Sequence, residues 1–280
     1  MFKKTLIAAS VGVAAAMTAI PAQAFSIQAG VYKMTVDGYT NGTIYNSDCN
    51  NAAACDLAAV TPAKGGVGSE DSWGILSIAS ITNTATNQVW FTRGTDGYLI
   101  GSITGLVDNI VSNTGGGFQR ELSTGAKVSI YSSALNYDPT INSSTQANVL
   151  AQFSALPLWL SFDFLLGATN TADGLVNSYS GNFDQTTGAA GGSGYLGVTG
   201  GSAAANFDTN SLVTNSGLPA DAFFTVTGKS PLSSDAGFGN WLLNDTLDVQ
   251  GQAIPEPGSL ALMGLGLAGL AGLRRRKQQA

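Results

Sequence analysis

The sequence predicts an all-β fold, an antiparallel sandwich-like domain with one short helix. Three features favour it: short segments in which apolar and polar residues alternate, clusters of Gly, Asn, Asp and Ser between those segments, and 36 glycines in 280 residues. Alternation with a period of two is typical of strands with one buried face, and turn-forming clusters separate such strands. A β-solenoid is the main alternative, but the glycine and aromatic positions show no fixed repeat.

Eight segments have the strand pattern. In chain order they cover residues 25–36, 73–81, 89–91, 98–107, 127–131, 158–166, 222–227 and 241–249. In the first, the apolar parity changes near Gly30, as a β-bulge allows. Segment 158–166 is the clearest. Its alternation predicts a buried face and an opposite face that carries Trp159, Ser161 and Asp163, with Asp163 directed to solvent. The buried face is Leu158, Leu160, Phe162, Phe164 and Leu166.

One segment departs from the strand pattern. Between Ser144 and Leu156, apolar residues recur at a spacing of three, a serine stands at the start and Pro157 follows the end. These are start and stop signals of a short helix. The glycine-rich run at 188–201 has two interpretations, a domain boundary or a long surface loop within one domain.

Charge and composition exclude several classes of function. Residues 25–254 carry six basic and seventeen acidic side chains, a net charge of −11. Nucleic acids and anionic lipids both need a positive surface, so neither is an expected partner. The chain contains no histidine, which removes Ser-His-Asp and Cys-His catalysis and the common zinc motifs. We therefore expect no enzymatic activity.

The two cysteines, Cys49 and Cys55, are expected to form a disulfide that closes a small loop, because a close pair in an exported protein meets an oxidising environment. A metal site would need further soft or imidazole ligands, and histidine is absent. No cofactor is expected, with calcium as the one candidate. Its ligands would be Asn206, Asp208 and Asn210, whose oxygens recur at alternate positions of a predicted loop. No EF-hand glutamate follows, and Asx residues in loops commonly cap turns.

The first 24 residues have the three parts of a signal peptide. Lys3 and Lys4 precede an apolar stretch at 6–20, and Ala22 and Ala24 form an A-x-A cleavage site. Phe25 is then the expected first residue of the mature protein. The body to be exported is residues 25–254.

The last 26 residues, 255–280, form a second signal. Pro255, Glu256 and Pro257 hold the chain extended, and the uncharged stretch 258–273 would span roughly 24 Å as a helix. A bilayer core measures ~30 Å, so this transmembrane helix is short. A basic stop follows and places the body outside the cytoplasm. It consists of Arg274, Arg275, Arg276 and Lys277.

This arrangement resembles the PEP-CTERM tail of exported bacterial proteins. The resemblance implies recognition by a membrane-embedded peptidase of the exosortase type, cleavage near Pro255-Glu256-Pro257 and loss of the basic helix. It also implies transient anchoring in the inner membrane, then transfer to the cell envelope or the exopolysaccharide matrix.

The sequence thus predicts an exported surface or matrix protein, structural or adhesive in an exopolysaccharide biofilm. A carbohydrate-binding module is the alternative, and it needs an exposed aromatic ring; the candidates are Trp73, Trp90, Trp159 and Trp241. A carboxylate-based glycan hydrolase is less favoured, because the body has only two glutamates, Glu70 and Glu121.

Overall fold

The computed structural model describes residues 30–41, 49–50, 54–55, 72–138, 146–170, 176–229 and 243–254. No helix within these parts is long and apolar enough to cross a membrane. The predicted transmembrane helix at 258–273 lies outside the described residues. So do the signal-cleavage and sorting residues, namely Ala22, Ala24, Phe25, Pro255, Glu256, Pro257, Arg274, Arg275 and Arg276.

The described residues form mainly one antiparallel sheet of ten strands. Its strands are β1 (Gly30–Asn41), β2 (Ser72–Asn83), β3 (Gln88–Thr92), β4 (Tyr98–Gly115), β5 (Phe118–Ser133), β6 (Leu158–Leu165), β9 (Tyr179–Asp184), β10 (Ala189–Gly200), β13 (Ala222–Lys229) and β14 (Leu243–Ala253). Two small two-stranded sheets accompany it. They are β7 (Thr169–Asn170) with β8 (Val176–Asn177), and β11 (Leu212–Val213) with β12 (Pro219–Ala220).

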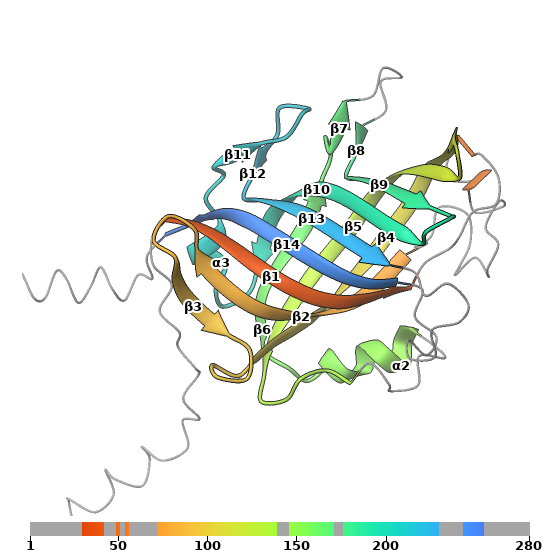
Figure 1. The fold of residues 1–280 in the computed structure, drawn as a ribbon. Coiled ribbons are helices and arrows are strands. Elements are labelled where there is room, and N and C mark those ends of the chain that lie inside the picture. The colour runs from red at the N-terminus through yellow and green to blue at the C-terminus, as the bar shows by residue number, and fades with distance from the viewer. Residues whose placement is uncertain are drawn as a thin grey trace, which may run out of the picture.

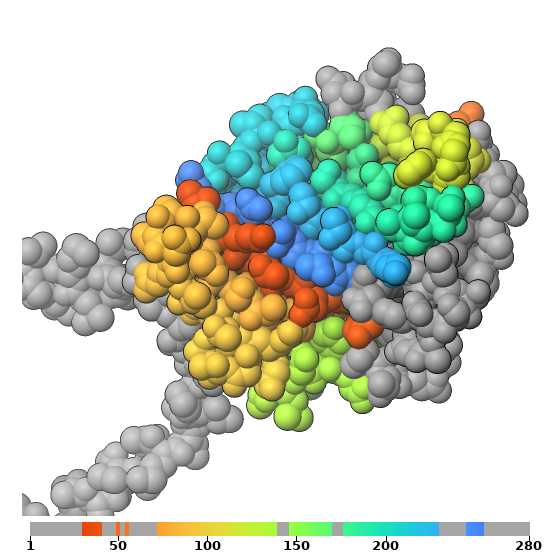
Figure 2. Space-filling model, viewed as in Figure 1, coloured from red at the N-terminus to blue at the C-terminus, as the bar shows by residue number. Residues whose placement is uncertain are grey.

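The large sheet closes on itself. Strand β1 pairs with β14 along one side and with β2 along the other, so the order β1-β14-β13-β10-β6-β5-β4-β2 returns to β1. Figure 1 shows β1, β13 and β14 in front and β4, β5 and β6 behind, and Figure 2 shows β1 (red) beside β14 (blue) on the visible face. The structure therefore differs from the predicted sandwich of two sheets. Both arrangements give each strand one inward face, so alternation alone does not separate them.

Strand β9 continues the line of β6. Both run antiparallel to β5, with β6 opposite residues 127–131 of β5 and β9 opposite residues 118–123. The chain leaves the sheet after Leu165, forms β7 and β8, and returns at Tyr179. The glycine-rich run at 188–201 is neither a boundary nor a loop: it forms β10, which lies centrally between β13 and the β6–β9 line. Its glycines make room for neighbouring rings, since a Cβ at Gly194 would lie 2.8 Å from the Phe164 ring.

The main core fills the inside of the closed sheet. Every second residue of β1 points inward, and Tyr32 and Met34 are fully buried. One end is covered by a short helix, α3 (Ala204–Phe207), in which Phe207 packs edge-on against Tyr32 and Trp159 with ring centroids 4.9 and 5.6 Å apart. Core residues from the other strands include Leu76, Ile78, Leu99, Val128, Ile130, Leu160, Phe162, Leu196, Phe224, Leu247 and Val249.

Segment 158–166 is confirmed as a strand, with Leu160, Phe162 and Phe164 buried as predicted, but its two ends and part of the opposite face differ from the prediction. Trp159 is 8% exposed and Ser161 is buried, whereas Leu158 and Leu166 at the two ends are 37% and 45% exposed. The register of β6 against β5 shifts so that Leu160 faces Ile130 and Leu158 faces Tyr131, which leaves Trp159 as an extra residue. A β-bulge of this kind redirects a side chain. Asp163 is exposed, as predicted.

A second core lies outside the closed sheet, under the predicted helix. The helix is confirmed as α2 (Gln146–Leu150) continued by the 3-10 turn η1 (Ala151–Phe153). Val149 and Phe153 are buried against side chains on the outer face of β2 and β4. Those partners are Trp73, Ile75 and Ile100. An apolar outer face explains why β2 carries a nearly continuous run of buried residues and not a clean alternation.

Candidate ligand cavity and outer groove

A cavity of about 140 Å³ lies inside the closed sheet. Its wall comes from strands on opposite sides of the closed sheet, with Thr40 on β1, Glu121 on β5 and Leu247 on β14. Glycines at lining positions permit the close approach of neighbouring groups, since a Cβ at Gly74 would lie 2.8 Å from the Tyr39 carbonyl oxygen and one at Gly181 would lie 2.9 Å from the Tyr179 ring.

Asp245 is the most unusual residue of the cavity wall. It is 2% exposed, and the Thr40 hydroxyl donates a hydrogen bond to its Oδ2 atom. Its Oδ1 atom is buried and accepts no hydrogen bond from the described residues. Burial raises the pKa of this carboxyl from 3.8 to about 6, and the hydrogen bond from Thr40 opposes the rise in part.

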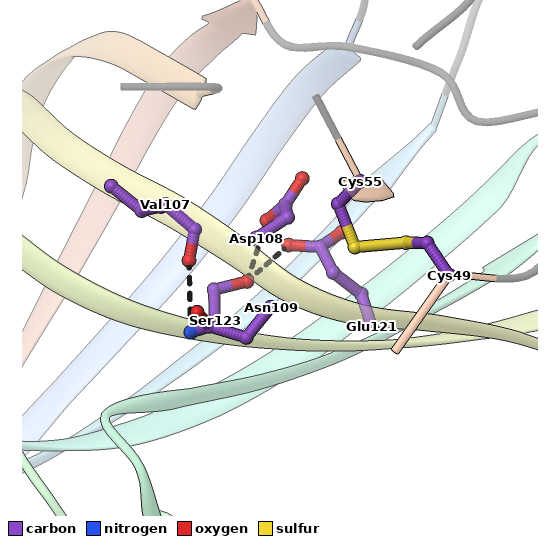
Figure 3. Close-up of a disulfide and its surroundings, with 7 residues drawn as sticks. All are labelled: Cys49, Cys55, Val107, Asp108, Asn109, Glu121 and Ser123. Atoms are coloured by element: carbon purple, nitrogen blue, oxygen red, sulfur yellow. Dashed lines mark hydrogen bonds between the residues drawn. A yellow bond between two sulfur atoms is a disulfide. The ribbon is translucent and has the colours of Figure 1, made fainter. Parts of the chain in front are cut away.

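Two further acids lie close by. The Ser123 hydroxyl oxygen is 2.6 Å from Asp108 Oδ1 and 2.8 Å from Glu121 Oε1, as Figure 3 shows. A hydroxyl has a single proton, so it donates to only one carboxylate at a time. The two carboxyl groups therefore share one donor.

Tyr179 connects these groups electrostatically. Burial raises the pKa of its phenol well above 10, and the negative charges of Glu121, Asp245 and Asp108 raise it further. All three carboxyl groups thus act on one ring that lines the cavity. The interior at this end of the sheet has a negative potential and a neutral tyrosine.

The predicted disulfide is present between Cys49 and Cys55. The backbone of Cys49 exchanges two hydrogen bonds with that of Val111 on β4, at N···O distances of 2.8 and 3.1 Å. Val111 also lines the cavity, and Figure 3 shows the disulfide beside Glu121. Cys49 is therefore fixed to the cavity wall at Val111, and the disulfide links Cys55 to the same place.

A larger, open groove of about 640 Å³ lies on the outer surface. Tyrosine rings and polar groups line it, and an ion pair between Arg93 and Asp37, with an N···O distance of 2.7 Å, stands among them. Burial raises the pKa of Tyr137, which keeps its hydroxyl protonated and available as a hydrogen-bond donor. The other lining residues are Tyr39, Tyr98 and Asn136, together with Gly38 and Gly94.

The residues expected to bind calcium serve other contacts. Asn206 lies buried in α3, the Asn210 amide donates to Asp208 Oδ1 at 3.1 Å, and the Asn210 backbone N–H donates to Asp221. Such local bonds are typical of Asx turns. Within the described residues no group of three His, Cys, Asp or Glu side chains is placed to hold a metal ion. Calcium binding stays a prediction.

Three of the four candidate tryptophans are buried: Trp73, Trp90 and Trp159 are 1%, 4% and 8% exposed. Trp241 lies outside the described residues. The aromatic residues that do border a groove are tyrosines, which the sequence analysis did not single out. Their signal was weak, because Tyr39, Tyr98 and Tyr137 come from three separate segments of the chain.

Comparison with known proteins identifies the tail. Residues 253–277 match the family model of the PEP-CTERM protein-sorting motif, which confirms the resemblance predicted for the C-terminal segment. No curated protein and no solved structure matches the chain. The motif indicates a protein that is exported, held transiently in the membrane and sorted to the cell surface through exosortase, a membrane protein.

Proposed function

We propose that residues 25–254 form a structural or adhesive protein of the cell envelope or exopolysaccharide matrix, without enzymatic activity. The observation that carries this proposal is the PEP-CTERM motif directly behind β14, the last strand of the body. A closed sheet suits such a location because it leaves few strand edges open to unwanted pairing outside the cell.

The first test is the intact mass of the protein recovered from the envelope and medium of its native host. We expect a chain that starts at Phe25 and ends near Pro255, since both signals would then have been processed. The Cys49–Cys55 disulfide should lower that mass by two hydrogens. A recovered chain that retains Arg274–Ala280 would mean that the tail is a permanent anchor, and the matrix proposal would lose its main support.

A carbohydrate-binding function is the second candidate, and the outer groove favours it. Tyrosine rings offer flat apolar faces, while the Arg93–Asp37 pair and Asn136 offer hydrogen-bond donors and acceptors. Binding sites commonly combine apolar faces with a few fixed polar groups. The groove is also open, as an extended polysaccharide requires. Adhesion to the matrix would then occur through this surface.

Changing Tyr98 to alanine tests this second function. We expect binding to exopolysaccharide from the host to weaken by roughly tenfold, which corresponds to ~1.4 kcal/mol, a usual cost for a contact-forming tyrosine. Tyr195→Ala is the matched control, because Tyr195 packs edge-on against Phe223 and does not line the groove. Circular dichroism of both variants would establish that they fold. Equal losses in the two variants, or none, would remove the groove as the glycan site.

A glycan hydrolase is less well supported. Its best pair of carboxylates is Asp108 with Glu121, and Asp108 is 1% exposed. The adjoining cavity of about 140 Å³ is small beside the ~300–1,000 Å³ of usual ligand sites. Turnover of a matrix glycan that stops in Glu121→Gln would support it over both other functions.

A further inference from the structure

The internal cavity lacks one hydrogen-bond donor. Asp245 lines it, is 2% exposed, and has its Oδ2 atom satisfied by Thr40. Oδ1 has no partner among the described residues. Buried carboxylate oxygens are normally hydrogen-bonded, because an unpaired oxygen loses its hydration without compensation. A hydrogen-bond donor on a bound ligand would replace the water that Oδ1 loses on burial.

The donor should carry a positive charge. Glu121 lines the same cavity, and Asp108 contacts Glu121 through the Ser123 hydroxyl. Among the described residues that line the cavity there is no lysine or arginine. The negative charge of these carboxylates is therefore not balanced by a side chain of the lining, and charge-assisted hydrogen bonds are the stronger kind.

The rest of the wall is apolar and aromatic. Phe164 packs edge-on against both Tyr179 and Phe224, with ring centroids 6.2 and 5.1 Å apart, and Leu247 lies among the lining residues. Aromatic faces attract cations as well as apolar groups. The volume of about 140 Å³ is close to that of an engineered cavity of ~150 Å³ that admits benzene. One small ring or a short alkyl chain fits.

We propose that this cavity binds a small organic cation, a protonated primary amine whose apolar body is about the size of one benzene ring. The ammonium group donates a hydrogen bond to Asp245 Oδ1, and the body packs against Phe164 and Phe224. A metal ion is less suited to the site, because the described residues provide no group of three acidic, cysteine or histidine ligands.

Benzylamine, which is protonated at pH 7, is a direct probe, and benzyl alcohol is its uncharged match. Calorimetric titration of the full-length protein in detergent is expected to show benzylamine binding at least tenfold more tightly than benzyl alcohol. The preference reflects a hydrogen bond to a charged group, worth ~1.5–3 kcal/mol. This comparison needs no variant, so it does not depend on how a substitution folds.

Asp245→Asn assigns the preference to one residue. The variant keeps the shape of the side chain and its acceptor for Thr40 but removes the charge. We expect benzylamine affinity to fall at least tenfold while the affinity for benzyl alcohol stays the same. Asp248→Asn is the control: Asp248 lies on the same strand, forms an ion pair with Lys33 on the other face and should leave both affinities unchanged.

Any of three titration results would overturn the proposal: equal affinities for the amine and the alcohol, an amine preference that survives in Asp245→Asn, or binding of neither probe. Stabilisation by calcium chloride without any effect of benzylamine would likewise reject an organic cation in favour of a metal ion.

Discussion

Replacing Gly101 by alanine is expected to lower the free energy of unfolding by about 3 kcal/mol or more. Gly101 lies on β4 between Leu76 of β2 and Ile130 of β5. A Cβ atom there would stand 3.0 Å from the Ile130 Cα atom and inside contact distance of the Ser129 carbonyl oxygen. Both neighbours are backbone, so no side chain can move aside, and β5 itself must shift. Overpacking of a well-packed interior costs ~1–3 kcal/mol, and rigid neighbours place this case at the upper end.

Gly200→Ala is the matched control. Gly200 lies on β10, and its added Cβ would meet the Ser161 hydroxyl at 3.5 Å, an ordinary contact. Alanine is expected to change stability little there or to raise it by up to ~1 kcal/mol, since glycine in a strand loses more conformational entropy on folding. Urea unfolding at pH 7 measures both. Similar free energies of unfolding for the two variants would show that the close approach of strands at Gly101 does not stabilise the closed sheet.

Gly101 also shows why the closed sheet could not be predicted. Alternation located most of the strands, because each has an inward apolar face: residues 98–107 and 222–227 lie within β4 and β13. Closure depends instead on which strands pair, and β1 pairs with β14 from the far end of the chain. The sequence does not distinguish a glycine that permits the close approach of two strands from a glycine in a turn. For this reason the prediction of a boundary or a loop at 188–201 is wrong, and the run forms β10.

The cavity, like the fold, was predictable only in part from the sequence. A signal for Asp245 was present, since it shares the parity of Leu247 and Val249 in the predicted strand 241–249 and so puts an acid on an apolar face. Nothing local indicated its neighbours, because Asp108 and Glu121 belong to the β4–β5 hairpin, far away in sequence. The disulfide was predictable from two cysteines alone. Trp159 was not, because a bulge changed its direction.

Asp245→Asn is expected to raise the free energy of unfolding at pH 7 by up to about 3 kcal/mol. Burial raises the pKa of Asp245 from 3.8 to about 6 in the folded protein. At 1.36 kcal/mol per pKa unit, that rise corresponds to about 3 kcal/mol. The folded state holds the proton more tightly, so this contribution to stability is fully present below pH 3.8 and is lost as the pH rises through about 6. An uncharged asparagine avoids the loss.

The pH profile therefore separates the two proteins. From pH 4 to pH 7 the unmodified protein should lose stability relative to Asp245→Asn, and urea unfolding at a series of pH values measures the difference. Thr40 on β1 donates to Asp245, and the charges of Asp245, Glu121 and Asp108 all act on Tyr179 of β9; the variant keeps all of these other groups. Subtracting the two profiles thus isolates Asp245. A constant difference across this range would contradict a raised pKa.

Asp184 provides a control, because its pKa is shifted in the opposite direction from that of Asp245. It is fully exposed, and the Thr187 hydroxyl and the Thr186 backbone N–H donate to it, which lowers its pKa. Its contribution is present above its unfolded pKa and is lost on acidification. At pH 7 the unmodified protein should be more stable than Asp184→Asn but less stable than Asp245→Asn. Both differences in the free energy of unfolding should shrink as the pH falls. The Asp245 charge connects the pH profile with the benzylamine titration. It lowers stability when no partner is bound, and a bound ammonium group should offset that loss. Benzylamine should therefore stabilise the unmodified protein and not Asp245→Asn.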